Sequence, residues 1–196
     1  LHAGAEMYGA DKVMLDLIQR LDKNLYKPYV ILPTNGVLVE ALKKIKVNVI
    51  VIPYPIMRRK YFNPKGIFLY GVRLIKYTNL IAKIAKKNNI DIIHTNTAAT
   101  LEGSFVSRKL HIPQLWSIHE IIVHPQIMYK MTSRLIAKYS SITITDSKAV
   151  KNHLDESGFF KKDAVKVIYN GVDSERFTPQ NDCSYLYAEW NIPSNA

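Results

Sequence analysis

The most specific stretch of the chain is VIYNGVDSERF, residues 167–177. Its β-branched start predicts the end of a strand over residues 165–169. The dipeptide Asn170-Gly171 then predicts a tight turn, because both residue types tolerate positive φ. Asp173 predicts an acidic cap, and the closing Phe predicts an aromatic anchor ahead of a linker. This stretch therefore predicts the last strand of a domain and the exit from it.

Upstream of this stretch, short apolar runs alternate with helical patterns. The apolar runs predict strands over residues 29–33, 47–54, 91–97, 114–119 and 141–146. The helical patterns cover residues 11–21, 37–44, 64–87, 100–110, 124–139 and 147–156. Because the apolar residues of the strands are nearly continuous, helices are expected on both faces of the sheet. The alternation predicts an α/β fold, a Rossmann-like three-layer domain with a parallel sheet.

Local signals predict where several helices begin. Asp11 and Ser147 are good N-caps, because their side-chain oxygens accept backbone N–H groups. Pro64 suits the first helical position, since its fixed φ is already helical. The Asn35-Gly36 dipeptide predicts a turn before the short second helix.

The two ends of the sequence predict a longer protein. Leu1 and His2 look like the last residues of a strand, so we expect a first strand to lie upstream. Residues 181–195 form a polar stretch that leads into a short helical pattern. We therefore expect an acceptor-side domain over residues 1–178, with a linker and the start of a further domain over residues 179–196.

Composition excludes several classes of protein. The 196 residues, 47% of them hydrophobic, suit one globular domain. No uncharged apolar run is long enough to span a membrane. The lone Cys183 forms no disulfide framework and no thiol metal site, which fits the cytoplasm. Acidic residues are too sparse for a carboxylate metal site, so we expect no metal and no cofactor.

The net charge of +11 is unevenly distributed, because no acidic residue lies between Glu40 and Asp91. Such a field attracts phosphates, acidic glycans or anionic lipids. A solvated basic face without a partner is the alternative. Nucleic acid is not expected, since no known RNA- or DNA-binding module accompanies the charge. The candidates for a membrane- or acceptor-binding patch are Arg58, Arg59, Lys60, Lys65, Arg73 and Lys76.

In open parallel sheets, ligands bind outside the carboxyl ends of the strands. The loop over residues 2–11 contains Gly4 and Gly9, which let a backbone approach a ligand closely. Its spacing is neither the dinucleotide fingerprint nor a P-loop. A structural turn and a phosphate cradle are about equally compatible with this loop alone.

Three further strand ends carry polar residues. The strand ending near residue 118 delivers His119 and Glu120 to the same edge. An imidazole there could donate to a sugar hydroxyl or phosphate, and Glu120 could orient it or be solvated. A lone His is otherwise more often structural. Residues 94–97 (HTNT) suit hydrogen bonding to a polyol, and Ser147-Lys148 suits an anionic ligand in addition to a helix cap.

Catalytic patterns of other enzyme classes do not occur in the sequence. No Ser has Gly two residues away on both sides, so there is no nucleophile elbow. There is no His-Glu-x-x-His pattern for zinc and no Asp-x-Asp pair that would hold a divalent ion against a nucleotide diphosphate.

The stretch over residues 167–177 resembles the sequence that closes the N-terminal domain in glycosyltransferase family 4, a retaining family with the GT-B fold. The glycine-containing loop over residues 4–11 resembles the family's loop after its first strand. His119-Glu120 is similar to its His-acid position, and Asp146-Ser147 to its strand-end Ser. The resemblance extends in order along essentially the whole chain.

The resemblance implies transfer of a sugar from a nucleotide-diphosphate donor to a glycan or lipid-linked acceptor, with retention and without an essential metal. A missing C-terminal domain would bind most of the nucleotide, so residues 1–196 alone should not turn over. Candidate roles are catalytic for His119 and Glu120; donor phosphate or sugar binding for Gly4, Ala5, Gly9, Asn170 and Gly171; and acceptor binding for Tyr8, Asn96, Thr97, Ser147 and Lys148.

Two alternatives share the fold, a sugar-nucleotide epimerase of GT-B type and a non-enzymatic anion-binding module. An epimerase would be expected to place acid/base carboxylates in its cleft. The expected setting of the transferase is cell-surface polysaccharide or glycolipid synthesis. The basic window could then dock on an anionic membrane at the inner face of the cell membrane, where a lipid-linked acceptor lies.

Overall fold

The computed structural model describes residues 1–175, 177–178, 184–191 and 193. Its six strands all pair in parallel and form two sheets. The smaller sheet contains β1 (Tyr29–Leu32) and β2 (Asn48–Val51). The larger has the order β3-β4-β5-β6, formed by Ile93–Thr95, Gln114–Ile118, Ile142–Thr145 and Val165–Val167. The α/β class and the parallel pairing are as predicted.

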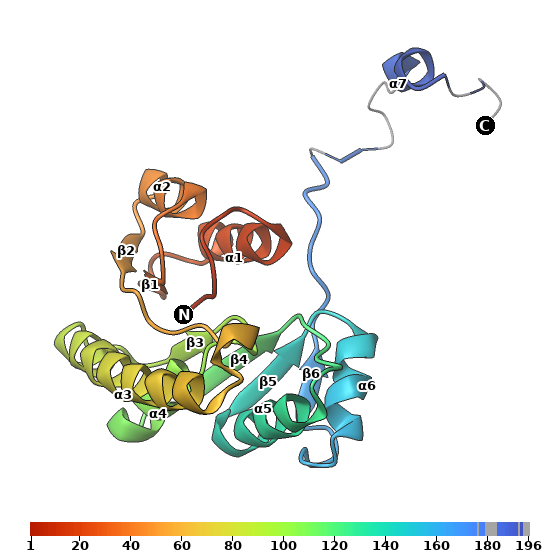
Figure 1. Cartoon of the computed structure of the whole chain (residues 1–196). Coiled ribbons are helices and arrows are strands. Elements are labelled where there is room, and N and C mark those ends of the chain that lie inside the picture. The colour runs from red at the N-terminus through yellow and green to blue at the C-terminus, as the bar shows by residue number, and fades with distance from the viewer. Residues whose placement is uncertain (176, 179–183, 192, 194–196) are drawn as a thin grey trace.

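Helices connect and cover these strands (Figure 1). The helices α1 and α2 lie beside the smaller sheet, whereas α3, α4, α5 and α6 lie along the larger one. Their bounds are α1 Gly9–Arg20, α2 Val37–Lys44, α3 Pro64–Lys87, α4 Glu102–Leu110, α5 Gln126–Tyr139 and α6 Lys148–Glu156. The short helices η1 (Arg59–Tyr61) and α7 (Ser184–Glu189) complete the described elements.

The predicted elements are confirmed, with shifts at their ends. The strand predicted over residues 47–54 ends at Val51, because Pro53 has no N–H to continue the ladder after Ile52 donates to Leu32. The helix η1 was not predicted, since three residues carry no periodicity. Pro64 is the first residue of α3, and Asn63 caps it by accepting from the Gly66 amide at 2.8 Å.

Leu1 lies beside β3 at the boundary between the two sheets. Its nitrogen donates to the His94 oxygen at 2.7 Å, and its oxygen accepts from the Asn96 amide at 2.9 Å. This is the bonding pattern of a parallel ladder. Leu1 therefore bonds to β3 as a neighbouring parallel strand would, although residues 1 and 2 are not assigned to a strand and the strands form two separate sheets.

Apolar packing joins the two sheets. One buried cluster combines Ile31 of β1, Ile52, Ile81 of α3, Ile93 of β3 and Val106 of α4. Separate clusters fill the smaller sheet with α1 and α2, and the larger sheet with α5 and α6. The shared cluster therefore packs β1 and the segment after β2 against β3, α3 and α4.

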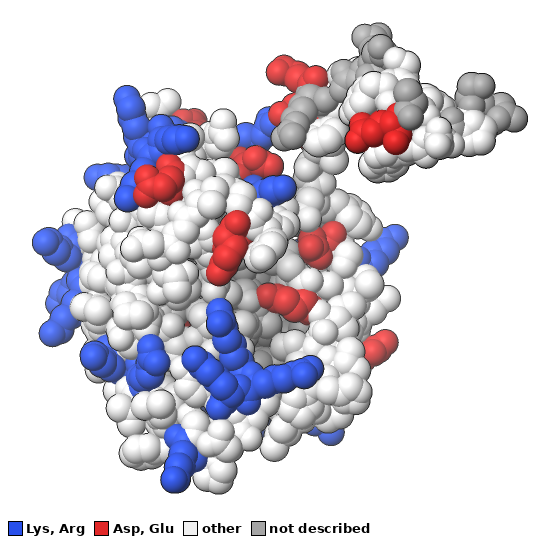
Figure 2. Space-filling model, turned by 45° about the horizontal axis from the view of Figure 1, so that its top comes forward, with Lys and Arg blue, Asp and Glu red and all other residues white. Residues whose placement is uncertain are grey.

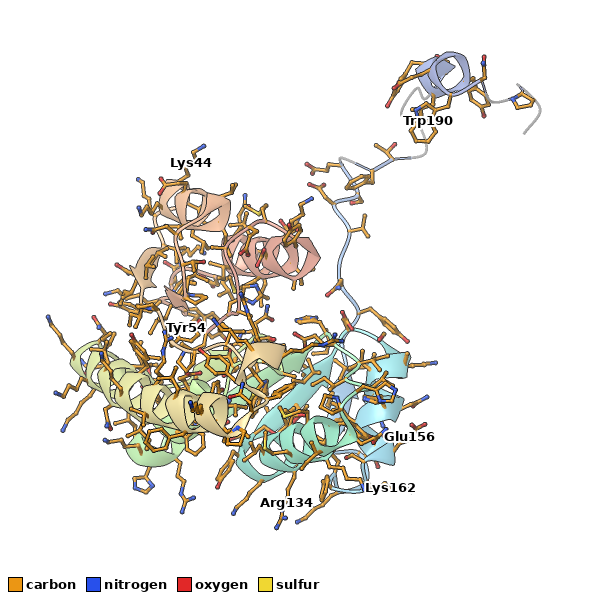
Figure 3. The ribbon with its side chains drawn as sticks, viewed as in Figure 1. Lys44, Tyr54, Arg134, Glu156, Lys162 and Trp190 are labelled. Carbon is orange, nitrogen blue, oxygen red and sulfur yellow. The ribbon has the colours of Figure 1, made fainter. Side chains whose placement is uncertain are left out.

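Tyr54 reinforces this junction, where Figure 3 labels it between the two sheets. Its buried hydroxyl lies 3.0 Å from the Ile31 oxygen and accepts from the His2 amide at 3.2 Å. Burial raises the pKa of this phenol, so the hydroxyl stays protonated. The bonds tie the N-terminal segment to β1.

Three expectations about local structure are wrong. Asn170 and Gly171 form no tight turn, and neither has a positive φ. Helix α1 begins at Gly9, so Tyr8 holds the N-cap position and Asp11 is the third helical residue. Asp11 still satisfies a free helix donor, since its carboxylate accepts from the Tyr8 amide at 2.8 Å. Phe177, expected to be an anchor, is 62% exposed. Arg176 lies outside the described residues, as do 179–183, 192 and 194–196 of the region 179–196 that was predicted as a linker and the start of a further domain.

Gly36 lets the glycine-containing N-terminal loop pack against α2. A Cβ atom at position 36 would lie 2.3 Å from the Ala5 oxygen, and that same oxygen accepts from the Leu38 amide at 3.0 Å. The close approach therefore requires a residue without a side chain.

We expect Gly36→Ala to lower the free energy of unfolding by about 1–3 kcal/mol, because backbone must shift to admit the methyl group. Gly71→Ala is the matched control inside α3, where nothing lies within 4 Å of the added Cβ. It should instead stabilise the chain by about 0.5–1 kcal/mol through helix propensity. Urea unfolding of both variants measures this, and a Gly36→Ala variant as stable as the wild type would contradict it.

Candidate functional site

The carboxyl ends of β3, β4 and β5 bring polar residues to one edge of the larger sheet. Asn96 and Thr97 follow β3, His119 and Glu120 follow β4, and Asp146 follows β5. The parallel register aligns Thr95 with Trp116 and Ile118 with Thr145. The predicted strand-end residues of these three strands therefore lie together.

His119 is held between two of these residues. Its Nε2 lies 3.0 Å from Asn96 Oδ1, and its Nδ1 lies 3.1 Å from Asp146 Oδ2. The side chain is only 15% exposed. Because both partners present acceptor oxygens, the ring donates to both only when it carries both protons. The geometry makes His119 a fixed hydrogen-bond donor and a potential positive charge.

Glu120 does not orient His119. Its carboxylate accepts from the Thr97 hydroxyl at 2.5 Å, from the Ala98 amide at 3.2 Å and from the His119 amide at 3.3 Å. These bonds hold the loop between β3 and α4 against the end of β4. The orienting role that the sequence suggested for Glu120 belongs to Asp146.

The N-terminal segment adds two residues whose part in the site was not predicted. The buried His2 ring contacts Asp11 through Nε2, while its Nδ1 lies 3.1 Å from the Asn96 oxygen and 3.2 Å from Asn96 Nδ2. A continuous polar network therefore runs through Asp11, His2, Asn96, His119 and Asp146. The one signal in the sequence was a His and an Asp on either side of the glycine-containing loop.

The loop over residues 4–9 lies beside this network, and part of it is buried in the fold. Ala5 is fully buried, and its amide donates to the Glu6 carboxylate at 2.8 Å. Gly4 is half-buried, whereas Tyr8 and Gly9 are exposed at the start of α1. The backbone of Gly9 and the ring of Tyr8 thus remain accessible to a ligand.

The remaining strand-end candidates follow β5 and β6. Ser147 caps α6 by accepting from the Val150 amide at 3.3 Å, as predicted, and Lys148 is exposed. Asn170 and Gly171 are exposed in the segment after β6. Within the described residues, no hydrogen bond joins these two to the network around His119.

A cavity of about 350 Å³ opens beside Glu120. We call it the groove; η1 and its flanks form one wall, and the start of α5 with the preceding loop forms the other. Its lining includes Met57, Arg58, Arg59, Phe62, Ile122 and Met128. Figure 2 shows Lys and Arg side chains gathered beside the hollow of this face.

The predicted basic patch divides into two kinds of residue. Arg58, Arg59, Lys60 and Lys65 are exposed around η1 and the start of α3. Arg73, in contrast, is half-buried and donates to the Pro53 oxygen at 2.8 Å. The patch accessible to a ligand is therefore centred on η1. Lys76 is exposed further along α3, with its ammonium 5.4 Å from the Tyr77 ring centre.

Two ionisable groups, the half-buried His94 and the buried Glu102, lie just below this edge. His94 contacts the Ser117 hydroxyl at 2.7 Å, and burial lowers its pKa to about 3, so the ring is neutral. Glu102 begins α4 and is fully buried. Burial raises the pKa of its carboxyl from 4.5 to about 8.

Glu102 should make the stability of the chain depend on pH. The folded chain keeps Glu102 protonated up to about pH 8, whereas the unfolded chain ionises it near pH 4.5. Stability from this group is therefore complete below pH 4.5 and is lost as pH rises towards 8. We expect Glu102→Gln, which stays neutral, to exceed the wild type in free energy of unfolding by about 3 kcal/mol at neutral pH.

Urea unfolding between about pH 4 and about pH 9 checks this expectation. The advantage of Glu102→Gln should grow across that interval and then level off. Glu156→Gln on the exposed face of α6, labelled in Figure 3, is the control and should not change with pH in this way. A constant difference between Glu102→Gln and the wild type would rule out the buried neutral carboxyl.

Among the described residues, no three His, Cys, Asp or Glu side chains are grouped so that they could hold a metal ion. No helix in the described part of the chain is long and apolar enough to cross a membrane.

The chain is similar to known proteins in both sequence and structure. The model of Glycosyltransferase Family 4 matches residues 7–176. No curated protein sequence matches the chain. A glycosyltransferase from Rickettsia africae superposes with a TM-score of 0.72 at 24% identity, over 100% of this chain and 50% of its own. HepE from Anabaena, solved with UDP, gives 0.69 at 20% identity, over 97% of this chain and 49% of its own.

A more distant match bears on the epimerase alternative. A putative UDP-N-acetylglucosamine 2-epimerase from Listeria monocytogenes superposes with a TM-score of 0.54 at 12% identity, over 84% of this chain and 44% of its own. The chain thus spans about half of the length of the solved structures it matches. At these identities the superpositions support the shared fold alone.

Proposed function

Because the chain belongs to glycosyltransferase family 4, we propose that it forms the acceptor-side half of an enzyme that transfers a sugar from a nucleotide-diphosphate donor to a glycan or lipid-linked acceptor. The observation that carries this proposal is His119, held between Asn96 and Asp146 at the carboxyl edge of the sheet. A rigid donor at that edge suits a substrate that develops negative charge as a diphosphate departs.

His119 can serve the reaction without leaving its place. A sugar or phosphate oxygen arriving at the edge would take the Nε2 hydrogen in place of Asn96 Oδ1, which lies 3.0 Å away. Asp146 would keep its contact with Nδ1 and so hold the ring in place. Asp146 and Asn96 are therefore positioning residues in this proposal, and His119 is the group that touches substrate.

Donor recognition would be shared with a second domain. HepE from Anabaena has been solved with UDP-glucose, which supports a nucleotide sugar as the donor class. The Gly9 backbone and the Tyr8 ring are accessible on this half, as is Lys148. We propose that the transfer proceeds with retention, needs no metal, and requires a C-terminal donor-binding domain facing this edge.

The carboxylates of the site favour transfer over epimerisation. Asp11, Glu120 and Asp146 each accept hydrogen bonds from groups of the protein itself. An epimerase would require a carboxylate free to remove a proton from the sugar.

We expect His119→Ala to reduce sugar transfer by about 10²- to 10³-fold, because a preorganised donor to developing charge is lost. The measurement is transfer from UDP-glucose and other nucleotide sugars by a polypeptide that contains this chain and its donor-binding domain. His111→Asn is the control, since His111 is exposed and left-handed at the end of α4, where Asn is tolerated. Wild-type transfer by His119→Ala would refute the role, and sugar-nucleotide isomerisation without an acceptor would favour the epimerase.

We propose that the enzyme acts at the cytoplasmic face of a membrane, in polysaccharide or glycolipid synthesis. The surface of α3 supports the contact with a membrane. Three apolar side chains in its first half are mostly exposed, Ile67 at 63%, Phe68 at 74% and Ile75 at 66%. The exposed Lys65 precedes them in α3 and the exposed Lys76 follows them. Apolar side chains flanked by cations suit an anionic lipid surface, where each Lys or Arg contributes about 1 kcal/mol.

We expect the chain to float with vesicles of phosphatidylcholine and phosphatidylglycerol but not with phosphatidylcholine alone. Phe68→Ser should weaken this binding about tenfold, because burying a Phe contributes about 1.5–3 kcal/mol. Val37→Ser, at a residue 62% exposed on α2, is the matched control and should bind like the wild type. Flotation that does not depend on the anionic lipid would dismiss the membrane setting.

A further inference from the structure

We propose that the groove beside Glu120 binds the phosphate-bearing headgroup of a lipid-linked acceptor, with phosphate on Arg58 and Arg59 and the first part of the lipid against Met57 and Phe62. The inference rests on the transferase function proposed above and specifies the chemistry of its acceptor. At about 350 Å³, the groove is at the small end of pockets that hold organic ligands.

Charge identifies one end of the occupant. Arg58 and Arg59 both line the groove and are exposed. Neither guanidinium group makes a hydrogen bond or ion pair with another described residue, in contrast to that of Arg73, which donates to Pro53. Two adjacent guanidinium groups match the charge and the paired oxygens of a diphosphate. The side of the groove formed by η1 therefore suits an anion.

Apolar side chains identify the other part. Met57, Phe62, Ile122 and Met128 line the groove together with the Arg pair. Methionine is flexible and polarisable, so it adapts to a hydrocarbon chain better than to a polar glycan. A free sugar phosphate would leave this apolar lining without a partner. A groove with both a cationic side and an apolar lining suits an amphiphilic ligand.

The position of the groove indicates how a bound lipid-linked acceptor would be oriented relative to His119. Glu120 belongs both to the groove and to the edge that carries His119. Its carboxylate is held by the Thr97 hydroxyl and can accept further hydrogen bonds from an acceptor sugar. At the opposite end, Phe62 leads directly into α3, whose Ile67 and Phe68 are exposed. The sugar would thus face His119 while the lipid runs towards the apolar surface of α3.

Farnesyl diphosphate is the probe, because it carries a diphosphate and a short isoprenoid chain in one molecule. We expect calorimetric titration of the chain to give a Kd at least about tenfold lower than those of inorganic pyrophosphate and of farnesol. The double variant Arg58→Ala/Arg59→Ala should weaken farnesyl diphosphate binding by about tenfold or more. Lys86→Ala/Lys87→Ala removes the same charge from exposed positions at the end of α3 and should leave the Kd nearly unchanged.

Methionine methyl resonances locate the binding site independently of affinity. With ¹³C-labelled methionine methyl groups, farnesyl diphosphate should shift Met57 and Met128, which line the groove, and leave the buried Met14 of α1 unchanged. Equal binding of pyrophosphate and farnesyl diphosphate would overturn the proposal in favour of an anion site, and equal binding of farnesol would overturn it in favour of an apolar site. Equal affinities for the two double variants would also overturn it.

These binding measurements need no donor sugar and no catalysis. Their outcome can therefore be separated from the outcome of the sugar-transfer assay. The chain could bind farnesyl diphosphate in the groove while the polypeptide that also contains the donor-binding domain transfers no sugar. That result would count against the transferase assignment and leave the groove as an amphiphile site. Sugar transfer that depends on His119, without binding of the probe at Met57 and Met128, would keep the transferase and reject this acceptor.

Discussion

The side chain and backbone of Asn96 join the two parts of the site. The Asn96 amide donates to Leu1, its carbonyl oxygen lies 3.1 Å from His2 Nδ1, and its side-chain oxygen lies 3.0 Å from His119 Nε2. One residue at the end of β3 therefore fixes the N-terminal segment and the candidate catalytic ring relative to each other. The contacts of His2 with Asp11 and of His119 with Asp146 extend the network from Asn96 in both directions.

This connection requires that the smaller sheet and the N-terminal segment keep their position relative to β3. The shared apolar cluster around Ile31, Ile93 and Val106 supplies that rigidity. Tyr54 adds hydrogen bonds at the same junction. Because packed interiors deform little, a ring positioned through such a junction can stay aligned for a substrate.

Charge separates the site into regions with different chemistry. The network around His119 holds its carboxylates in internal hydrogen bonds, whereas the cations around η1 are left accessible. An anionic group is therefore attracted to the η1 side, and the region near Glu120 remains suited to hydroxyl groups. The exposed apolar side chains of α3 continue from the η1 side, which accounts for the placement of lipid in both proposals.

The local elements of this protein followed from its sequence alone. Strands and helices form where the period of apolar residues, Pro64 and Ser147 indicate them, because these signals act over a few residues. The family was also predicted from the sequence, since motifs such as His119-Glu120 occur along the chain in the order that the family has. The strand-end position of Asn96 and His119 was also foreseeable, because parallel strands share one carboxyl edge.

The roles within the site were decided by tertiary structure. Asp146 rather than the adjacent Glu120 contacts the His119 ring, because strand register places the end of β5 beside that ring and turns Glu120 towards Thr97. The sequence alone could not separate the accessible Arg58 from Arg73, whose guanidinium folds back onto Pro53. Side-chain partners and exposure depend on residues far apart in the chain, and only their packing determines which polar groups meet.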